Sequence, residues 1–506
     1  IAATDLTIDA VNGVNIKTDV TTADVVLSKS GSIVINEANA ITLTNLQTAD
    51  GDVTVTTAGT MTVANVEANG TTATASLTST AGNIAQDADV TAPAVTAANT
   101  VLSASTGIGS QTTINTSPLT LETDTLKATS TTGDIVLAQQ GALMLDAITA
   151  TAGNVNLAIS DGGLTNKSSA SLLTGDAVKV TAEGHVAINT AAGSLLAIST
   201  NSGDINVTEA NGVTRTNLSA ENVTLTSITG NIGVGLIQAA DAVVLDAKAG
   251  AILDAYDDDA STRDINITAL SLDAKATQGI GRPGQVLETG LKTLKASTES
   301  GGVFIGNTGP LTVDAVTAGG GDIAIRSTET ITQTGLISTT GTGDITLFGT
   351  NVTMAPGSRT TAVSGSVNYS AQQAVTITSV VTKAGVGGGI VTIKAPTVNA
   401  DNSVRPNITG WVIDVSGDNV DLPRIQLLVG EEAIQSALIK QGFEVVGGTL
   451  ANSRQFMEQI LMPLQVDGNL PVNGALSRGL SPVSAPQLNS YNGFTEQLNG
   501  EWTFRL

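Results

Sequence analysis

Four aspartates within six residues form the densest group of chemically active side chains in this sequence. They lie in the segment LDAYDDDAST and are Asp254, Asp257, Asp258 and Asp259. Carboxylate oxygens at this density could bind Ca²⁺. The spacing matches neither an EF-hand loop nor the Gly-Gly-x-Gly-x-Asp nonapeptide, so we favour an acidic, solvated loop and keep calcium as the alternative. Apart from calcium, we expect no cofactor.

The same region raises the question of sugar cleavage. Tyr256 stands among the aspartates, and Arg263 and Arg282 follow them. Glycan-cleaving sites need converging carboxylates, alone or with a basic residue. Beyond Tyr256 no aromatic platform for a sugar accompanies these residues. We therefore expect no catalytic residues and no enzyme activity, with a carbohydrate-active β-helix enzyme as the alternative.

The remaining candidates for chemistry are few. His185 is the only histidine and the chain has no cysteine, so a transition-metal site is not expected. The segment EGHVAIN places His185 where other copies of a repeat have Asp, which predicts an outward, structural role. Residues 385–390, GVGGGI, lack the Gly-Lys-Ser/Thr ending of a phosphate loop and are interpreted as a turn.

The elements that would position such residues are short repeats. A glycine followed by a short alternating apolar segment recurs about every 24 residues. Alternation over four to six residues between Gly, Asn, Asp and Ser predicts a β-strand. In Gly133-Asp-Ile-Val-Leu, we expect Asp134 to face solvent while Ile135 and Leu137 stack on neighbouring copies. The clearest copies begin at Gly31, Gly51, Gly133, Gly203, Gly321 and Gly343.

Strands and turns at this period fit one coil of a parallel β-helix. A single coil cannot bury its apolar row, but coils stacked about 4.8 Å apart build a continuous core. The expected fold is all-β, a parallel β-solenoid of about 16 or more coils. An immunoglobulin-like array would show a period of about 100 residues and usually a buried Trp, and residues 1–400 show neither.

Composition limits the partners. The net charge is −23, which argues against nucleic acid and anionic lipid because both need clustered Lys and Arg. No run of about 18 apolar residues is present, so no membrane-spanning segment is expected. The first residues lack the features of a signal peptide, which indicates either a chain that is not exported or a mature or excised piece.

Near residue 400 the composition changes. Residues 401–506 contain both Trp and four of six Phe. Segments 430–442 and 452–464 have helical spacing, and the end alternates again. We predict a small mixed α/β region that caps the last coil; the alternative is a tail that docks on a neighbouring chain and joins subunits. The self-association residues would be Tyr491, Phe494, Trp502, Phe504 and Leu506.

Two long segments resemble each other and a known family. Residues 102–137 and 272–306 share Leu-x-Ala, Gly-Ile-Gly, a Pro-containing loop, Leu-x-Thr, Leu-Lys-Ala-Ser/Thr and a glycine-led strand. Residues 30–400 resemble the repeat region of filamentous-haemagglutinin-like large exoproteins, the passengers of two-partner secretion. The resemblance implies a right-handed parallel β-helix at a bacterial surface and an outer-membrane secretion partner. The N-terminal secretion domain of that family is not recognisable, and residues 401–506 match none of its elements.

These observations give one working hypothesis. Residues 1–400 form the solenoid, and residues 401–506 form a cap or subunit-joining region. The protein is expected to be extracellular or on the bacterial cell surface, where it builds or decorates a fibre without catalysis, as a homo-oligomer or head-to-tail filament. The alternatives are an adhesin rod that binds a host or matrix ligand and the enzyme considered above.

Overall fold

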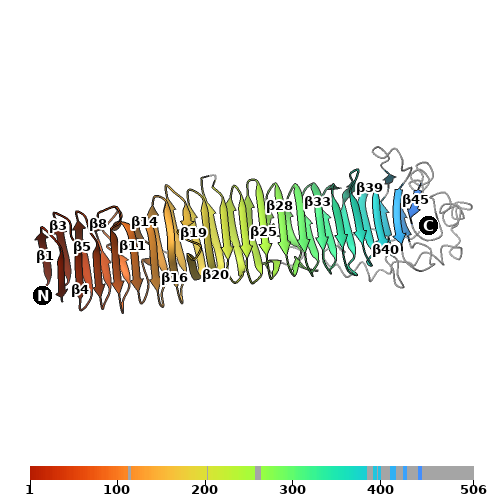
Figure 1. Cartoon of the computed structure of the whole chain (residues 1–506). Coiled ribbons are helices and arrows are strands. Elements are labelled where there is room, and N and C mark those ends of the chain that lie inside the picture. Colours follow the sequence, from red (N-terminus) through yellow and green to blue (C-terminus); the bar gives the residue numbers. More distant parts are fainter. Residues whose placement is uncertain are drawn as a thin grey trace, which may run out of the picture. The chain divides into compact units, whose positions relative to one another are not determined.

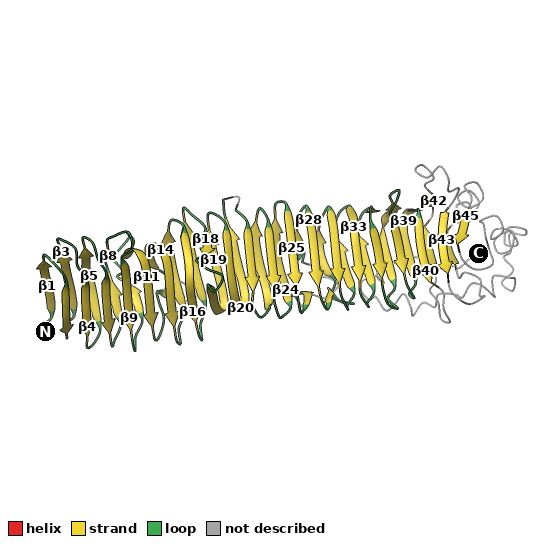
Figure 2. Ribbon diagram, in the orientation of Figure 1, coloured by secondary structure: helices red, strands yellow, loops and turns green. Residues whose placement is uncertain are grey.

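The described part of the chain consists of β-strands, turns and loops. The computed structural model describes residues 1–111, 116–201, 203–256, 264–383, 391–395, 397–400, 411–416, 425–429 and 443–446. Within them there is no helix, and the strands form a parallel β-solenoid of about 18 turns. Figure 2 shows this all-strand composition. The predicted fold class and the expectation of about 16 or more coils are confirmed.

The chain divides into two compact units near residue 230. Unit 1 comprises Ile1–Gly230 and Ile237–Ala239, and unit 2 comprises Asn231–Leu236 and Ala240–Leu506. In each unit, successive strands lie side by side from one coil to the next (Figure 1).

Unit 1 provides the strands needed for the description below. These are β2 (Val14–Thr18), β4 (Ile33–Glu37), β6 (Val53–Thr57), β15 (Ile135–Gln140), β17 (Val155–Ser160), β20 (Val186–Ser199) and β21 (Ile205–Glu209). The corresponding strands of unit 2 are β30 (Leu287–Gly290), β32 (Val303–Asn307), β33 (Leu311–Ala318), β34 (Ile323–Ser327), β35 (Ile331–Gln333), β36 (Leu336–Thr339), β37 (Ile345–Met354), β38 (Arg359–Ala362), β39 (Val367–Ile377) and β40 (Ser379–Lys383).

Each coil of unit 2 contributes to three parallel ladders. The first joins β32, β34, β37 and β39, and its equivalent residues Val303, Ile323, Ile345 and Val367 lie 20 to 22 positions apart. The second ladder runs through β33, β35 and the second half of β37, and the third through β33, β36, β38 and β40. Three strands and three turns per coil explain the period seen in the sequence.

The core is a set of aliphatic columns inside the coils. Ile305, Ile325 and Leu347 are each fully buried and occupy equivalent positions in successive coils. In unit 1, Ile135 and Leu137 pair with Val155 and Leu157, as predicted. Because each buried Val, Leu or Ile side chain contributes roughly 1.5–3 kcal/mol, the columns compensate for the scarcity of aromatic residues.

The glycine that opens each repeat is required mainly by close backbone approach. A Cβ on Gly343 would lie 2.2 Å from the carbonyl oxygen of Gly321, and one on Gly365 would lie 2.0 Å from that of Gly343. Neither distance is possible for a real side chain. Gly31 and Gly51 also have positive φ values, of 148° and 157°. Crowding between successive coils is therefore the common reason for the recurring glycine.

The ladders continue beyond residue 400. Strands β41 (Val391–Ala395), β43 (Trp411–Ser416), β44 (Ile425–Val429) and β45 (Phe443–Val446) pair in parallel with the coils before them. Solenoid pairing thus reaches into the segment 401–506 that was predicted as a cap or tail. The helices expected at 430–442 and 452–464 lie outside the described residues.

Candidate functional site

The aspartate after the repeat glycine bonds one coil to the next. Asp322 Oδ1 accepts the backbone N–H of Asp344 at 2.8 Å, and Asp344 Oδ1 accepts that of Ser366 at 2.6 Å. In unit 1, Asp134 does the same for the N–H of Asn154 at 2.7 Å. We call this set the acceptor column. Asp134 is half-buried and engaged in a hydrogen bond rather than simply facing solvent, so that expectation was incomplete.

His185 belongs to the acceptor column. Its Nδ1 accepts the N–H of Asp204 at 2.9 Å, the geometry that Asp provides elsewhere. The imidazole side chain is 67% exposed, and the carboxylate of Asp204 lies 3.5 Å from Nδ1. The alignment of His185 with the repeat Asp is thereby confirmed, and its ring accepts a hydrogen bond from the next coil as that Asp does.

A second polar feature lies inside the coil, where the first strand ends, and we call it the strand-end corner. Glu37 in β4 accepts the N–H groups of Val20 and Asn39, each at 3.0 Å. Glu209 in β21 is fully buried and accepts the Thr190 hydroxyl at 2.7 Å and the N–H groups of Ala192 and Asn211. In both cases the carboxylate satisfies turn donors of its own coil and of the preceding coil.

Unit 2 fills the same corner with an amide. Asn307 Oδ1 accepts the N–H of Leu291 at 2.8 Å and the hydroxyl of Thr289, and its Nδ2 donates to Gly309 O. Sequence reasoning missed this corner, although a signal existed. The triplet Glu-Ala-Asn closes a strand at residues 37–39 and 209–211, but it also occurs at 67–69, where Glu67 instead accepts the side-chain amide of Gln47.

Burial perturbs two carboxyl groups in these features. Desolvation raises the pKa of Glu209 above its ordinary value, against the lowering effect of its hydrogen bonds from Thr190 and the turn N–H groups. Desolvation also raises the pKa of Asp344, and the nearby Asp322 charge adds to the rise. Both carboxyl groups accept hydrogen bonds from a neighbouring coil. Their raised pKa values therefore follow from the way in which the coils stack.

The predicted calcium ligands are only partly within the described residues. Asp254 Oδ1 accepts the side-chain N–H of Asn266 at 2.7 Å and the backbone N–H of Tyr256 at 2.9 Å. Asp257, Asp258 and Asp259 lie outside the described residues, as does Arg263. Among the residues that are described, no group of three or more His, Cys, Asp or Glu side chains is arranged to hold a metal ion. The calcium site remains a prediction.

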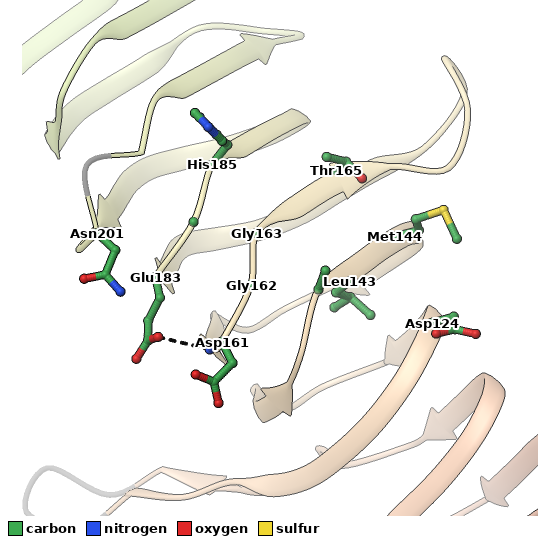
Figure 3. A pocket seen from close by; sticks show the side chains of 12 residues that line it. Asp124, Leu143, Met144, Asp161, Gly162, Gly163, Thr165, Glu183, His185 and Asn201 are labelled. Carbon is green, nitrogen blue, oxygen red and sulfur yellow. Dashed lines mark hydrogen bonds between the residues drawn. The ribbon is translucent and has the colours of Figure 1, made fainter.

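Unit 1 carries an open groove that sequence reasoning did not find. It encloses about 650 Å³. At one end Asp161, Glu183 and Asn201 lie together, and at the other end lie Asp124 and Met144 (Figure 3). The N–H of Asp161 donates to Glu183 Oε2 at 3.2 Å, and Asp161 adopts a left-handed φ of 57°.

The groove is lined mainly by acidic side chains, together with His185 and one exposed apolar side chain (Figure 3). Three of its lining side chains are carboxylates, whereas Met144 is 42% exposed. Carboxylates accept hydrogen bonds from hydroxyl, amide and ammonium groups. The groove suits a ligand that donates hydrogen bonds and also carries an apolar face. No sequence motif predicts this groove, because its lining residues come from separate coils.

Comparisons with known protein families, with curated proteins and with solved structures gave no match to this chain. No helix among the described residues has the length and apolar character needed to cross a membrane. The predicted self-association residues Tyr491, Phe494, Trp502, Phe504 and Leu506 lie outside the described residues, so the tail remains a prediction. The chain is a parallel β-solenoid repeat protein.

Proposed function

We propose that this protein is a non-enzymatic structural or adhesive component of a bacterial surface fibre, acting outside the cell. The acceptor column carries the proposal. Polar side chains that could serve a reaction instead bond one coil to the next, as in Asp322, Asp344 and His185. A protein whose polar side chains form hydrogen bonds between its coils is suited to building an extended structure. The resemblance to filamentous-haemagglutinin-like exoproteins supports the extracellular setting.

Electron microscopy of the purified protein over a concentration range tests the fibre-building form of this proposal. Filaments several chains long that form with increasing concentration are the expected result. Single particles at every concentration would leave only the decorating or adhesive form. Incubation with a panel of surface polysaccharides supplies a separate test, since release of new sugar ends would contradict the non-enzymatic assignment.

A second candidate function is ligand binding by an adhesin, and the acidic groove of unit 1 favours it. Asp161 and Glu183 offer acceptors at one end, and Met144 offers an apolar contact at the other. Screening against a glycan array and against matrix peptides would test it. Binding that is lost in Glu183→Gln but kept in Glu221→Gln, a change outside the groove, would support this function, and equal binding by both variants would contradict it.

A further inference from the structure

Unit 1 carries a second groove, which lies beside the acidic one. It encloses about 640 Å³. The short strand β18 (Leu164–Asn166) connects the two grooves, since Thr165 lines the acidic groove and Asn166 lines the second one. The second groove is lined by serine, threonine, asparagine, alanine, leucine and isoleucine residues, none of which carries a charge. We call it the neutral groove.

One wall of the neutral groove is the loop that follows β18. Asn189 in β20 holds this loop, because its Nδ2 donates to the carbonyl oxygens of Ser169 and Ser171 at 3.2 and 3.1 Å. Lys167 belongs to the same loop, but it pairs with Asp146 at 3.8 Å and does not line the groove. The loop therefore presents hydroxyl groups rather than a charge to a ligand.

An uncharged strip of outward side chains joins the two grooves. We call it the neutral strip, and its members in β18, β20 and β21 are Thr165, Ala187, Asn189, Asn206 and Thr208. Residues 163 and 168, one in each groove, lie at most about 17 Å apart along an extended strand. Within the described residues, the side chains of Thr165, Asn206 and Thr208 form no hydrogen bond with another protein group. Their hydroxyl and amide groups can therefore donate to a ligand and accept from it.

The grooves and the strip together define the chemistry of a ligand. Its middle should carry hydroxyl and amide groups, which match the neutral strip. Both of its ends should carry an apolar face, because Met144 in the acidic groove is 42% exposed and Ile228 in the neutral groove is 40% exposed. One end should also carry a cation, since Asp161 and Glu183 lie together in the acidic groove (Figure 3) and carboxylates form charge-assisted hydrogen bonds with ammonium groups.

The pairing of the strands favours a sugar chain over a peptide. Extended peptides commonly bind by adding a strand to a free sheet edge. Here β18 pairs with β16 (Leu143–Ala150) and β20, and β21 pairs with β20 and β23 (Val223–Ser227), so both edges of each strand are occupied. A ligand on the neutral strip must be recognised by side chains alone, which suits a chain rich in hydroxyl groups.

We propose that a linear amino-sugar oligosaccharide binds along the neutral strip, with an amine-bearing unit beside Asp161 and Glu183 and its other end in the neutral groove. Its hydroxyl and acetamido groups bond to Asn206 and Thr208, and its ring faces pack on the exposed apolar side chain of each groove. This inference rests on the proposed ligand-binding function of the acidic groove. It adds the class of ligand and the second half of the site.

Calorimetric titration of the full chain tests the proposal. The probe is an N-acetylglucosamine hexamer in which one terminal unit lacks its acetyl group. It should bind about tenfold more tightly than the fully acetylated hexamer, which has no ammonium group for the acidic groove. It should also bind more tightly than glucosamine alone, which cannot reach the neutral strip.

Two matched variants test the neutral strip. Thr208→Arg places a bulky cation in the strip and should weaken binding of the probe about tenfold. Thr56→Arg is the control, because Thr56 is also half-buried and outward and follows its repeat glycine, in β6, at the same distance as Thr208 does in β21. The control variant should bind the probe as tightly as the wild type does.

A further variant guards against misfolding. Ser169→Arg obstructs the neutral groove from an exposed loop, so the strands stay intact, and it should also weaken binding of the probe. The proposal is overturned if the probe does not bind, or if Thr208→Arg or Ser169→Arg binds it as tightly as the wild type does. Equal binding of a hexapeptide with a terminal lysine also overturns it.

The glycan array and the matrix peptides separate this inference from the function on which it rests. If a different ligand binds and is lost in Glu183→Gln, the amino-sugar assignment fails while ligand binding by the acidic groove stands. If no ligand binds at all, both fail.

Discussion

The two Gly-Ile-Gly loops of the molecule share a geometry and differ in what lies beside them. Gly109 in unit 1 and Gly281 in unit 2 have left-handed φ values of 67° and 61°, and each approaches the carbonyl of the next coil's strand. In unit 1 that strand offers the buried Val136, but the residues paired with it in the next two coils, Asn156 and Lys179, are half-buried and exposed. In unit 2 the buried surface extends over two further coils. The outer face of the same repeat is therefore partly exposed in unit 1 and buried in unit 2, through a few outward positions.

The strand-end corner gives a second comparison. Unit 1 uses the carboxyl of Glu209 where unit 2 uses the amide of Asn307. Both accept the N–H two residues beyond the paired threonine of the preceding coil. The backbone requirement is therefore constant, while the ionisable character of the corner is not. Of these two groups only the Glu209 carboxyl can ionise, and burial raises its pKa.

The largest expected effect lies among the outward side chains of β32, β34 and β37, which are buried: Phe304, Ala324, Arg326, Thr346 and Phe348. Phe348→Ala should lower the free energy of unfolding of unit 2 by about 3 kcal/mol, because it empties a covered aromatic site. Asn156→Ala, at an outward position of β17 in unit 1, should change it by less than about 0.5 kcal/mol. Urea denaturation followed by circular dichroism measures both. Equal, small effects would show that the two outer surfaces do not differ.

The next effect tests whether the two loops are equivalent. Gly281→Ala and Gly109→Ala should each cost about 2 kcal/mol, because the new Cβ would lie 2.4 Å and 2.2 Å from a backbone oxygen at a left-handed φ. Gly284→Ala is the matched control, since its φ is 84° but nothing lies within 4 Å. It should cost only about 1 kcal/mol, from the left-handed backbone alone. If the control costs as much as the others, crowding is not the cause.

A smaller and uniform effect is expected in the acceptor column. Asp322→Ala in unit 2 and Asp134→Ala in unit 1 should each lower stability by about 1 kcal/mol, since each leaves one backbone N–H without its acceptor. His185→Asp should cause no loss, because aspartate supplies the same acceptor. Thermal unfolding monitored by circular dichroism would show this. A large loss in His185→Asp would indicate a role for the imidazole beyond the column.

The smallest expected effect is a difference in the pH dependence of stability between the Glu209 corner and the Asn307 corner. The raised pKa of Glu209 means that its protonated form is favoured by folding, so its contribution is fully present below the ordinary value of 4.5 and is lost as pH rises through the raised pKa. The melting temperature of the wild type minus that of Glu209→Gln should therefore fall as pH increases from 4 to neutral. Asn307→Asp should introduce the same trend in unit 2. A difference that is flat with pH would contradict this assignment.

Sequence periodicity was sufficient to predict the solenoid. Every coil has the same pattern of strands and turns. A short segment is therefore enough to predict the fold, as the alternation of Ile135 and Leu137 and the recurring glycine show. His185 could also be placed, because it replaces Asp at a fixed point of the repeat. Both predictions rest on neighbours separated by one period.

The sites could not be predicted in the same way. The acidic groove is lined by Asp124, Asp161 and Glu183 from three coils, and nothing in one repeat marks them as parts of one site. Outward Phe304 and Phe348 looked like ordinary members of alternating strands, since burial of the second face depends on a cover from elsewhere in the chain. Periodicity predicts which residues face inward, but it does not predict what covers the outside.

The acceptor column also bears on how such a chain changes length over generations. In each hydrogen bond of the acceptor column, one coil must supply an acceptor side chain, as Asp322 does. The other coil supplies only a backbone N–H, which every residue except proline has. A duplicated or deleted coil therefore finds a compatible neighbour without a second, compensating mutation. The number of coils can therefore change by whole coils while the hydrogen bonds between coils are kept. Selection can then act on the length of the solenoid without changing its fold.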